Sequence, residues 1–123
     1  MKKRNSEIVR GNMRYRYLGN SGLKVSIIGF GNYFNSNSES SYEKTRDSIK
    51  LCYESGINFF DSAEIYSNGE AERQMGRAFK ELGLKRENLV ISTKLIKLGD
   101  DVNATFMSRK HIVEGLTDSL KRL

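Results

Sequence analysis

One cysteine, one histidine and no long apolar run characterise this sequence, and each shortage excludes a kind of protein. Cys52 alone cannot form an internal disulfide, which fits a reducing compartment. A single cysteine and the single His111 cannot make a cluster of metal ligands, so we expect no metal site. No stretch approaches the roughly 18 apolar residues of a membrane span, and none fits a signal peptide. We therefore expect a cytoplasmic protein that is not inserted into a membrane.

Basic charge gathers at the N-terminal end of the chain. The formal net charge is +6, and residues 1–16 carry six basic side chains against one acidic side chain. The rest of the chain is almost balanced, with fifteen basic and fourteen acidic residues. Residues 1–13 are therefore predicted to form a basic flexible arm, and residues 14–123 the folded part. We interpret the arm as a solvated segment rather than as a nucleic-acid tether.

The folded part alternates short apolar runs with helical patterns. Alternating residues on both sides of Gly19-Asn-Ser-Gly22 predict a short hairpin. Three later apolar runs predict buried strands, at residues 26–31, 56–61 and 89–94. Capping residues and apolar spacing predict helices from Ser40 to Gly56, from Ser67 to Gly83 and from Ser108 onward. The same spacing gives the first two helices an inner face that includes Ile49 and Met75, respectively. This order is typical of βαβ units around a parallel sheet, which is the α/β class.

The third predicted helix carries an apolar stripe and the only histidine. His111 lies near the start of this helix beside two basic residues, and we expect it at the surface. Spacings of three and four residues place five apolar side chains on one side, which we expect to face the core. These side chains are Ile112, Val113, Leu116, Leu120 and Leu123.

Three reactive side chains follow two neighbouring predicted strands. Asp61 and Lys94 end these strands, and Tyr66 lies in the loop after Asp61. A phenol with a pKa of about 10 is a weak acid at neutral pH unless a nearby cation stabilises its anion, and Lys94 could be that cation. Asp61 would hold the ammonium while Tyr66 gives its proton to a carbonyl oxygen. Taken singly, such residues commonly cap a turn, pack or end a strand in solvent.

The segments that carry these residues resemble a known family. Gly56-Ile-Asn-Phe-Phe-Asp-Ser-Ala-Glu-Ile-Tyr66 and Asn88-Leu-Val-Ile-Ser-Thr-Lys94 are similar to the catalytic signature of the NADP-dependent aldo-keto reductases. Met13-Arg-Tyr-Arg-Tyr-Leu-Gly19, Ser21-Gly-Leu-Lys-Val25 and Ser108-Arg-Lys-His-Ile-Val-Glu-Gly-Leu116 resemble the branch that contains the β subunits of voltage-gated potassium channels. The resemblance runs from about Met13 to Leu123.

The resemblance implies a partial TIM barrel and a reaction. We expect an N-terminal hairpin and about three βα units of a (β/α)8 barrel, because a complete barrel needs roughly 250 residues. The chain would then be the N-terminal fragment of its parent. Tyr66, Asp61 and Lys94 match the catalytic positions of the family, and the parent would reduce carbonyl substrates with NADPH. The family's fourth catalytic position, a His or an Asn, lies outside this chain, so we expect the fragment to be inactive.

The resemblance also implies a partial cofactor site. Gly31, Asn32 and Tyr33 stand where the family has Gly-Thr-Trp, and with Asp61 they would contact the NADPH cofactor. Most of the family's cofactor contacts belong to the later part of the barrel.

A non-enzymatic function is the alternative. A half-barrel of this kind could bind a partner, such as the cytoplasmic domain of a voltage-gated potassium channel. Because the third predicted strand leaves the sheet open, we also expect the chain to associate with itself. The sequence leaves the substrate, the channel partner and the oligomeric state open.

Overall fold

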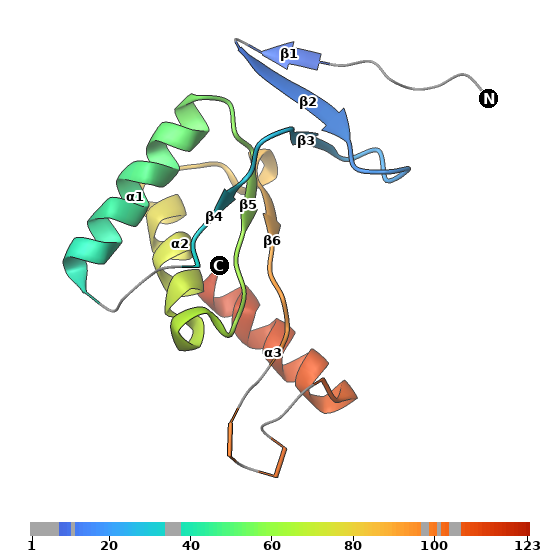
Figure 1. Cartoon of the computed structure of the whole chain (residues 1–123), viewed down its shortest axis with the longest axis vertical. Coiled ribbons are helices and arrows are strands. Elements are labelled where there is room, and N and C mark those ends of the chain that lie inside the picture. The colour runs from blue at the N-terminus through green and yellow to red at the C-terminus, as the bar shows by residue number, and fades with distance from the viewer. Residues whose placement is uncertain (1–7, 11, 34–37, 97–98, 101, 104–106) are drawn as a thin grey trace.

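The computed structural model describes residues 8–10, 12–33, 38–96, 99–100, 102–103 and 107–123. This part of the chain forms two three-stranded sheets and three α-helices (Figure 1). The strands are β1 (Ile8–Arg10), β2 (Met13–Tyr17), β3 (Lys24–Ser26), β4 (Phe30–Gly31), β5 (Phe59–Asp61) and β6 (Val90–Ser92). The helices are α1 (Glu39–Glu54), α2 (Glu70–Glu81) and α3 (Arg109–Arg122), with short 3₁₀ helices η1 (Tyr66–Gly69) and η2 (Arg86–Asn88).

The first sheet is antiparallel and has the order β1-β2-β3. The predicted hairpin is confirmed as β2 paired with β3. The segment predicted to be a flexible arm differs, because its residues 8–10 form β1 and pair with β2. The charge pattern of this segment says nothing of its β-branched residues Ile8 and Val9, which favour extended backbone. Residues 1–7 and 11 of the predicted arm lie outside the described residues.

Asn58 joins the first sheet to the start of β5. Its side-chain Oδ1 accepts a hydrogen bond from Ser26 N at 2.8 Å, and its Nδ2 donates to Lys24 O at 3.0 Å. Tyr15 Oη donates to Gly56 O at 2.6 Å. The antiparallel sheet therefore lies at the end of the parallel sheet where β5 and β6 begin (Figure 1).

The second sheet is parallel and has the order β4-β5-β6, as the alternating pattern predicted. Phe60 in the central strand pairs with Phe30 on one side and Ile91 on the other. One residue later, Asp61 pairs with Gly31 and with Ser92. The carboxyl ends of all three strands therefore meet at one edge.

The first predicted strand, residues 26–31, is wrong in its length. Ser26 belongs to the antiparallel sheet, and only Phe30 and Gly31 pair with β5. Between them the Ser26 hydroxyl donates to Ile28 O at 2.6 Å, which turns the chain from one sheet to the other. Ile28 is consequently 56 % exposed rather than buried.

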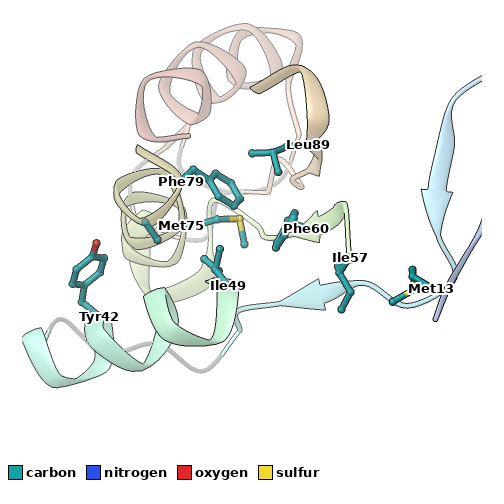
Figure 2. Packing of buried hydrophobic residues seen from close by; sticks show 9 residues of the cluster. Met13, Tyr42, Ile49, Ile57, Phe60, Met75, Phe79 and Leu89 are labelled. Atoms are coloured by element: carbon teal, nitrogen blue, oxygen red, sulfur yellow. The ribbon is translucent and has the colours of Figure 1, made fainter. Parts of the chain in front are cut away.

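The hydrophobic core lies between the parallel sheet and helices α1 and α2 (Figure 2). Phe60 is fully buried and meets Phe79 of α2 edge to face, with ring centroids 5.1 Å apart. Ile49 of α1 and Met75 of α2 are also fully buried. Such burial contributes about 1.5–3 kcal/mol for each large apolar side chain. The predicted inner faces of the first two helices are confirmed.

The helix ends differ partly from the prediction. Helix α1 begins after Ser38 rather than at the predicted cap Ser40, and the Ser38 hydroxyl accepts a hydrogen bond from Ser41 N at 3.1 Å. Gly69 precedes α2 in place of the predicted Ser67 cap, because Ser67 itself adopts a left-handed conformation with φ 49°. Gly56 follows α1 with φ +91°, which a residue with a Cβ adopts at a cost.

Helix α3 packs with the side opposite to the predicted one. Ser108 caps it as predicted, through a hydrogen bond from His111 N. His111, Gly115 and Ser119 are buried, so the prediction of a surface histidine is wrong. Leu123 packs against the core as predicted, but the other four side chains of the expected inner stripe are open to solvent, 43 to 69 % exposed: Ile112, Val113, Leu116 and Leu120.

Close approach to α2 explains this orientation. Helix α3 lies beside α2 (Figure 1), and a Cβ added to Gly76 would lie 2.1 Å from Arg122 O. A buried carboxylate also needs a polar partner. In α3, Arg122 pairs with Glu72, and His111 pairs with Glu64. Small and polar residues of α3 therefore face inward, because they allow the approach and satisfy the buried charges.

Candidate active site

Asp61 and Lys94 meet at the carboxyl edge of the parallel sheet. Lys94 Nζ donates to Asp61 Oδ2 at 2.6 Å and to Ser62 O at 2.8 Å. The Ser92 hydroxyl donates to Asp61 Oδ1 at 2.5 Å, so both carboxylate oxygens are engaged. The side chains of Asp61 and Lys94 are 37 and 49 % exposed, which leaves the pair accessible to a ligand. An exposed pair of this kind adds little stability.

Tyr66 lies next to this pair. The ammonium of Lys94 is 5.2 Å from the centre of the Tyr66 ring. Partial burial alone would lower the pKa of Lys94, but hydrogen bonding and charge from Asp61 and Tyr66 outweigh burial and raise it. The lysine is therefore held as a cation beside a phenol. The structure thus brings together the three residues that the sequence singled out.

A strained turn presents Tyr66 at the sheet edge. Tyr66 N donates to Ala63 O at 3.1 Å, and the next two residues have positive φ angles. Those residues are Ser67 and Asn68, with φ of 49° and 53°. Each left-handed non-glycine residue costs roughly 1 kcal/mol or more, so packing of the surrounding helices must hold this turn.

The predicted cofactor residues surround the same edge. Gly31 ends β4 beside Asp61, and the nearest atom to a Cβ placed there would be Asp61 O at 3.9 Å. The ring of Tyr33 meets the ring of Tyr66 edge to face, with centroids 4.8 Å apart. Asn32 is buried, and its Nδ2 donates to Ala71 O at 2.6 Å. The role of these residues in cofactor binding stays a prediction.

The edge carries polar and aromatic groups that suit a planar polar ligand. Two buried polar atoms at the strand ends, Asn32 Oδ1 and Ser62 Oγ, have no hydrogen-bond partner among the described residues. At Gly31 a Cβ would meet no atom closer than Asp61 O at 3.9 Å, and residue Tyr33 is 59 % exposed. A planar polar ring suits such a setting, because aromatic side chains provide apolar contact and the orphaned groups provide hydrogen bonds.

Several supporting residues carried no clear signal in the sequence. Ser92 fixes Asp61, and Glu72 accepts a hydrogen bond from Thr93 Oγ1 at 2.5 Å directly before Lys94. Glu64 pairs with His111 across two elements. Acidic residues in helices and loops are usually solvated, so neither Glu72 of α2 nor Glu64 of the loop after β5 stood out. Only the tertiary contacts reveal their burial.

Other kinds of site are absent from the described part of the chain. No group of three or more His, Cys, Asp or Glu side chains there is placed to hold a metal ion. Burial raises the pKa of the Cys52 thiol, which lowers its thiolate fraction. None of the described helices has both the length and the apolar character needed to cross a bilayer. A shallow pocket between α1 and α2, lined by Tyr42, Arg73 and Arg77 among others, lies away from Lys94.

Comparison with known sequences shows the family of the chain. Residues 27–123 match the profile of the "Aldo/keto reductase family". A protein of Arabidopsis thaliana named "Probable voltage-gated potassium channel subunit beta" is 47 % identical over 111 residues. An Oryza sativa protein of the same name is 45 % identical over 111 residues. Each alignment covers 90 % of this chain and 34 % of the relative, so the chain spans about a third of these relatives.

Comparison with solved structures agrees with the fold. The aldo-keto reductase AKR11C1 from Bacillus halodurans, in its holo form, superposes with a TM-score of 0.73 and 32 % identity. The alignment covers 90 % of this chain and 36 % of that structure. The predicted partial TIM barrel is therefore confirmed. With this profile match and the three residues gathered at the sheet edge, the chain belongs to the aldo-keto reductase family.

Proposed function

We propose that this chain carries the proton-donating part of a site that reduces a carbonyl compound to an alcohol. One observation supports this most strongly: Asp61 and the Ser62 carbonyl hold the Lys94 ammonium beside the Tyr66 ring. A phenol needs such a cation to act as an acid near neutral pH. The proposal concerns a whole protein like these relatives, of which this chain matches about a third.

Each of the three residues has a separate task. Tyr66 gives its hydroxyl proton to the carbonyl oxygen, and Lys94 stabilises the phenolate that forms. Asp61 holds the ammonium at 2.6 Å and favours its charged form. NADPH, when bound, supplies the hydride that the carbonyl carbon needs to complete the alcohol.

The residues proposed to bind the cofactor lie at the same edge of the parallel sheet. We place Gly31, Tyr33 and Asp61 at the nicotinamide end, where space and an exposed ring are available. Asn32 would take part through its orphaned Oδ1, since its Nδ2 already binds Ala71 O. The holo form of the Bacillus relative supports a cofactor in this family. The cytoplasmic location expected from the sequence stays a prediction.

We expect the 123-residue chain alone to lack reductase activity. Its relatives are about three times longer, and the resemblance places the fourth catalytic residue and most cofactor contacts outside it. The three residues described here can orient a proton donor, but they cannot enclose a substrate and a dinucleotide. Enclosure matters because exclusion of water strengthens the electrostatic interactions inside a site.

Partner binding is the second candidate function. The Arabidopsis and Oryza relatives are named as probable channel β subunits, and the exposed α3 stripe of Ile112, Val113, Leu116 and Leu120 is apolar. Exposed apolar surfaces of this kind commonly bind another protein. In this case the chain would act through association, and Tyr66 would be dispensable.

Cofactor titration separates the two functions. A chimera in which this chain replaces the matching third of the Bacillus reductase would be titrated with NADPH and assayed with a simple aldehyde. Binding and steady NADPH oxidation by the chimera would support the enzyme. A folded chimera that binds NADPH but does not oxidise it, while the Bacillus protein does, would count against this proton-donating site.

A further inference from the structure

A largely buried hydrogen-bonded contact joins the Tyr66 loop to helix α3. His111 Nε2 lies 2.5 Å from Glu64 Oε1, and each side chain is only 10 % exposed. A Cβ on Gly115 would lie 2.8 Å from Glu64 Oε2, so a larger residue there would push this carboxylate aside. Glu64 and His111 are 47 residues apart in sequence and belong to no part of the reacting set.

Glu64 also touches both segments that carry the reacting groups. Its backbone N–H donates to Lys94 O at 3.1 Å. Tyr66 lies two residues further along the chain, held by a hydrogen bond to Ala63 O. Glu64 therefore links the segment that carries Tyr66 to the segment that carries Lys94. The strained turn after Tyr66 adds to this need for support, because it does not hold its conformation by local preference.

A second buried contact ties α3 to the Lys94 segment. Arg122 Nε donates to Glu72 Oε2 at 2.6 Å, and the other oxygen of Glu72 accepts from Thr93 Oγ1. Thr93 directly precedes Lys94. Helix α3 thus reaches the Tyr66 loop near its start and the Lys94 segment near its end.

We propose that helix α3 positions the proton donor, with His111 and Glu64 as positioning residues that fix Tyr66 relative to Lys94. Neither residue touches the reacting atoms. The inference rests on the proposed function, because the position of Tyr66 matters only if it donates the proton. The NMR test measures geometry alone, so its result can be interpreted even if the protein does not reduce carbonyl compounds.

The test compares three variants of the 123-residue chain by NMR. His111→Leu keeps an apolar side chain of similar size but removes the hydrogen bond to Glu64. His111→Gln restores a side-chain N–H that can reach the carboxylate. Glu114→Gln is the matched control, since it removes an exposed ion pair with Lys110 on the same helix. The readouts are the nuclear Overhauser effect between the Tyr66 ring and the Lys94 ε-methylene, and the exchange rate of the Glu64 amide.

The proposal expects a specific pattern. In His111→Leu the Overhauser effect should disappear and the Glu64 amide should exchange about tenfold faster or more, because a buried carboxylate has lost its partner. In His111→Gln and Glu114→Gln both readouts should stay near those of the original chain. A folded His111→Leu variant that keeps both readouts would overturn the proposal, as would an equal change in Glu114→Gln.

If His111→Leu does not fold, amide hydrogen exchange in the unsubstituted chain tests the proposal instead. At increasing urea, the Glu64 amide and the amides of α3 should open together with the same dependence on urea. Opening of α3 that leaves the Glu64 amide protected, or the reverse, would overturn the proposal, because the helix and the loop would then be independent.

Discussion

Replacing Arg122 by leucine should destabilise the fold strongly, because it leaves a buried carboxylate without its cation. Glu72 is 0 % exposed and accepts hydrogen bonds from Arg122 Nε at 2.6 Å and from Thr93 Oγ1 at 2.5 Å. Breaking one side of a buried ion pair costs about 3–5 kcal/mol. Single domains have a free energy of unfolding of about 5–15 kcal/mol, so the change should remove a large share of it.

Urea denaturation followed by circular dichroism measures this loss. With a slope of about 2 kcal/mol per molar urea, a loss of about 4 kcal/mol lowers the midpoint by about 2 M. Lys121→Leu is the matched control: its pair with Asp118 is exposed on the same helix, and it should cost less than about 1 kcal/mol. The double variant Glu72→Leu with Arg122→Leu should recover much of the loss. An Arg122→Leu midpoint equal to that of Lys121→Leu would refute the reasoning.

Three further predictions follow from the fold. Burial, with Glu81 nearby, raises the pKa of Tyr42 to about 12. The stability that this group contributes is therefore complete below about pH 10 and is lost as the pH rises through 12. In denaturation measured against pH, Tyr42→Phe should make this fall in the free energy of unfolding smaller. Gly76→Ala should cost about 1–3 kcal/mol in urea denaturation instead of stabilising α2, since the Cβ meets Arg122 O, and a gain would contradict this contact. Sedimentation at micromolar concentration should detect self-association, through the unpaired β6 edge and the exposed apolar face of α3, and Leu116→Lys on that face should reduce it; a sharp monomer would contradict this expectation.

Much of the parallel unit could be predicted from local patterns. Asp61 and Lys94 close apolar runs, and the structure places both at the carboxyl edge, as parallel strands require. The inner faces of α1 and α2 follow from apolar spacing, and burial of Ile49 and Met75 confirms them. These features depend on neighbouring residues in the sequence, which is why periodicity captures them.

The missed features depend on contacts between distant residues. The apolar stripe of α3 predicted an inward face, but Gly76 and the carboxylates of Glu64 and Glu72 select the opposite side. Burial of His111 follows from Glu64, which lies 47 residues earlier, and no spacing rule connects them. Strand β1 escaped notice because charge dominates residues 1–16.

Turnover by Tyr66→Phe tests the central claim most directly. In the chimera with the Bacillus reductase, this variant should reduce aldehyde at least about 100-fold more slowly, because it lacks the acidic proton, while its affinity for NADPH stays nearly the same. Tyr53→Phe is the matched control, since Tyr53 packs against the core away from the sheet edge. Equal turnover by Tyr66→Phe and Tyr53→Phe would contradict the assignment of Tyr66 as the proton donor.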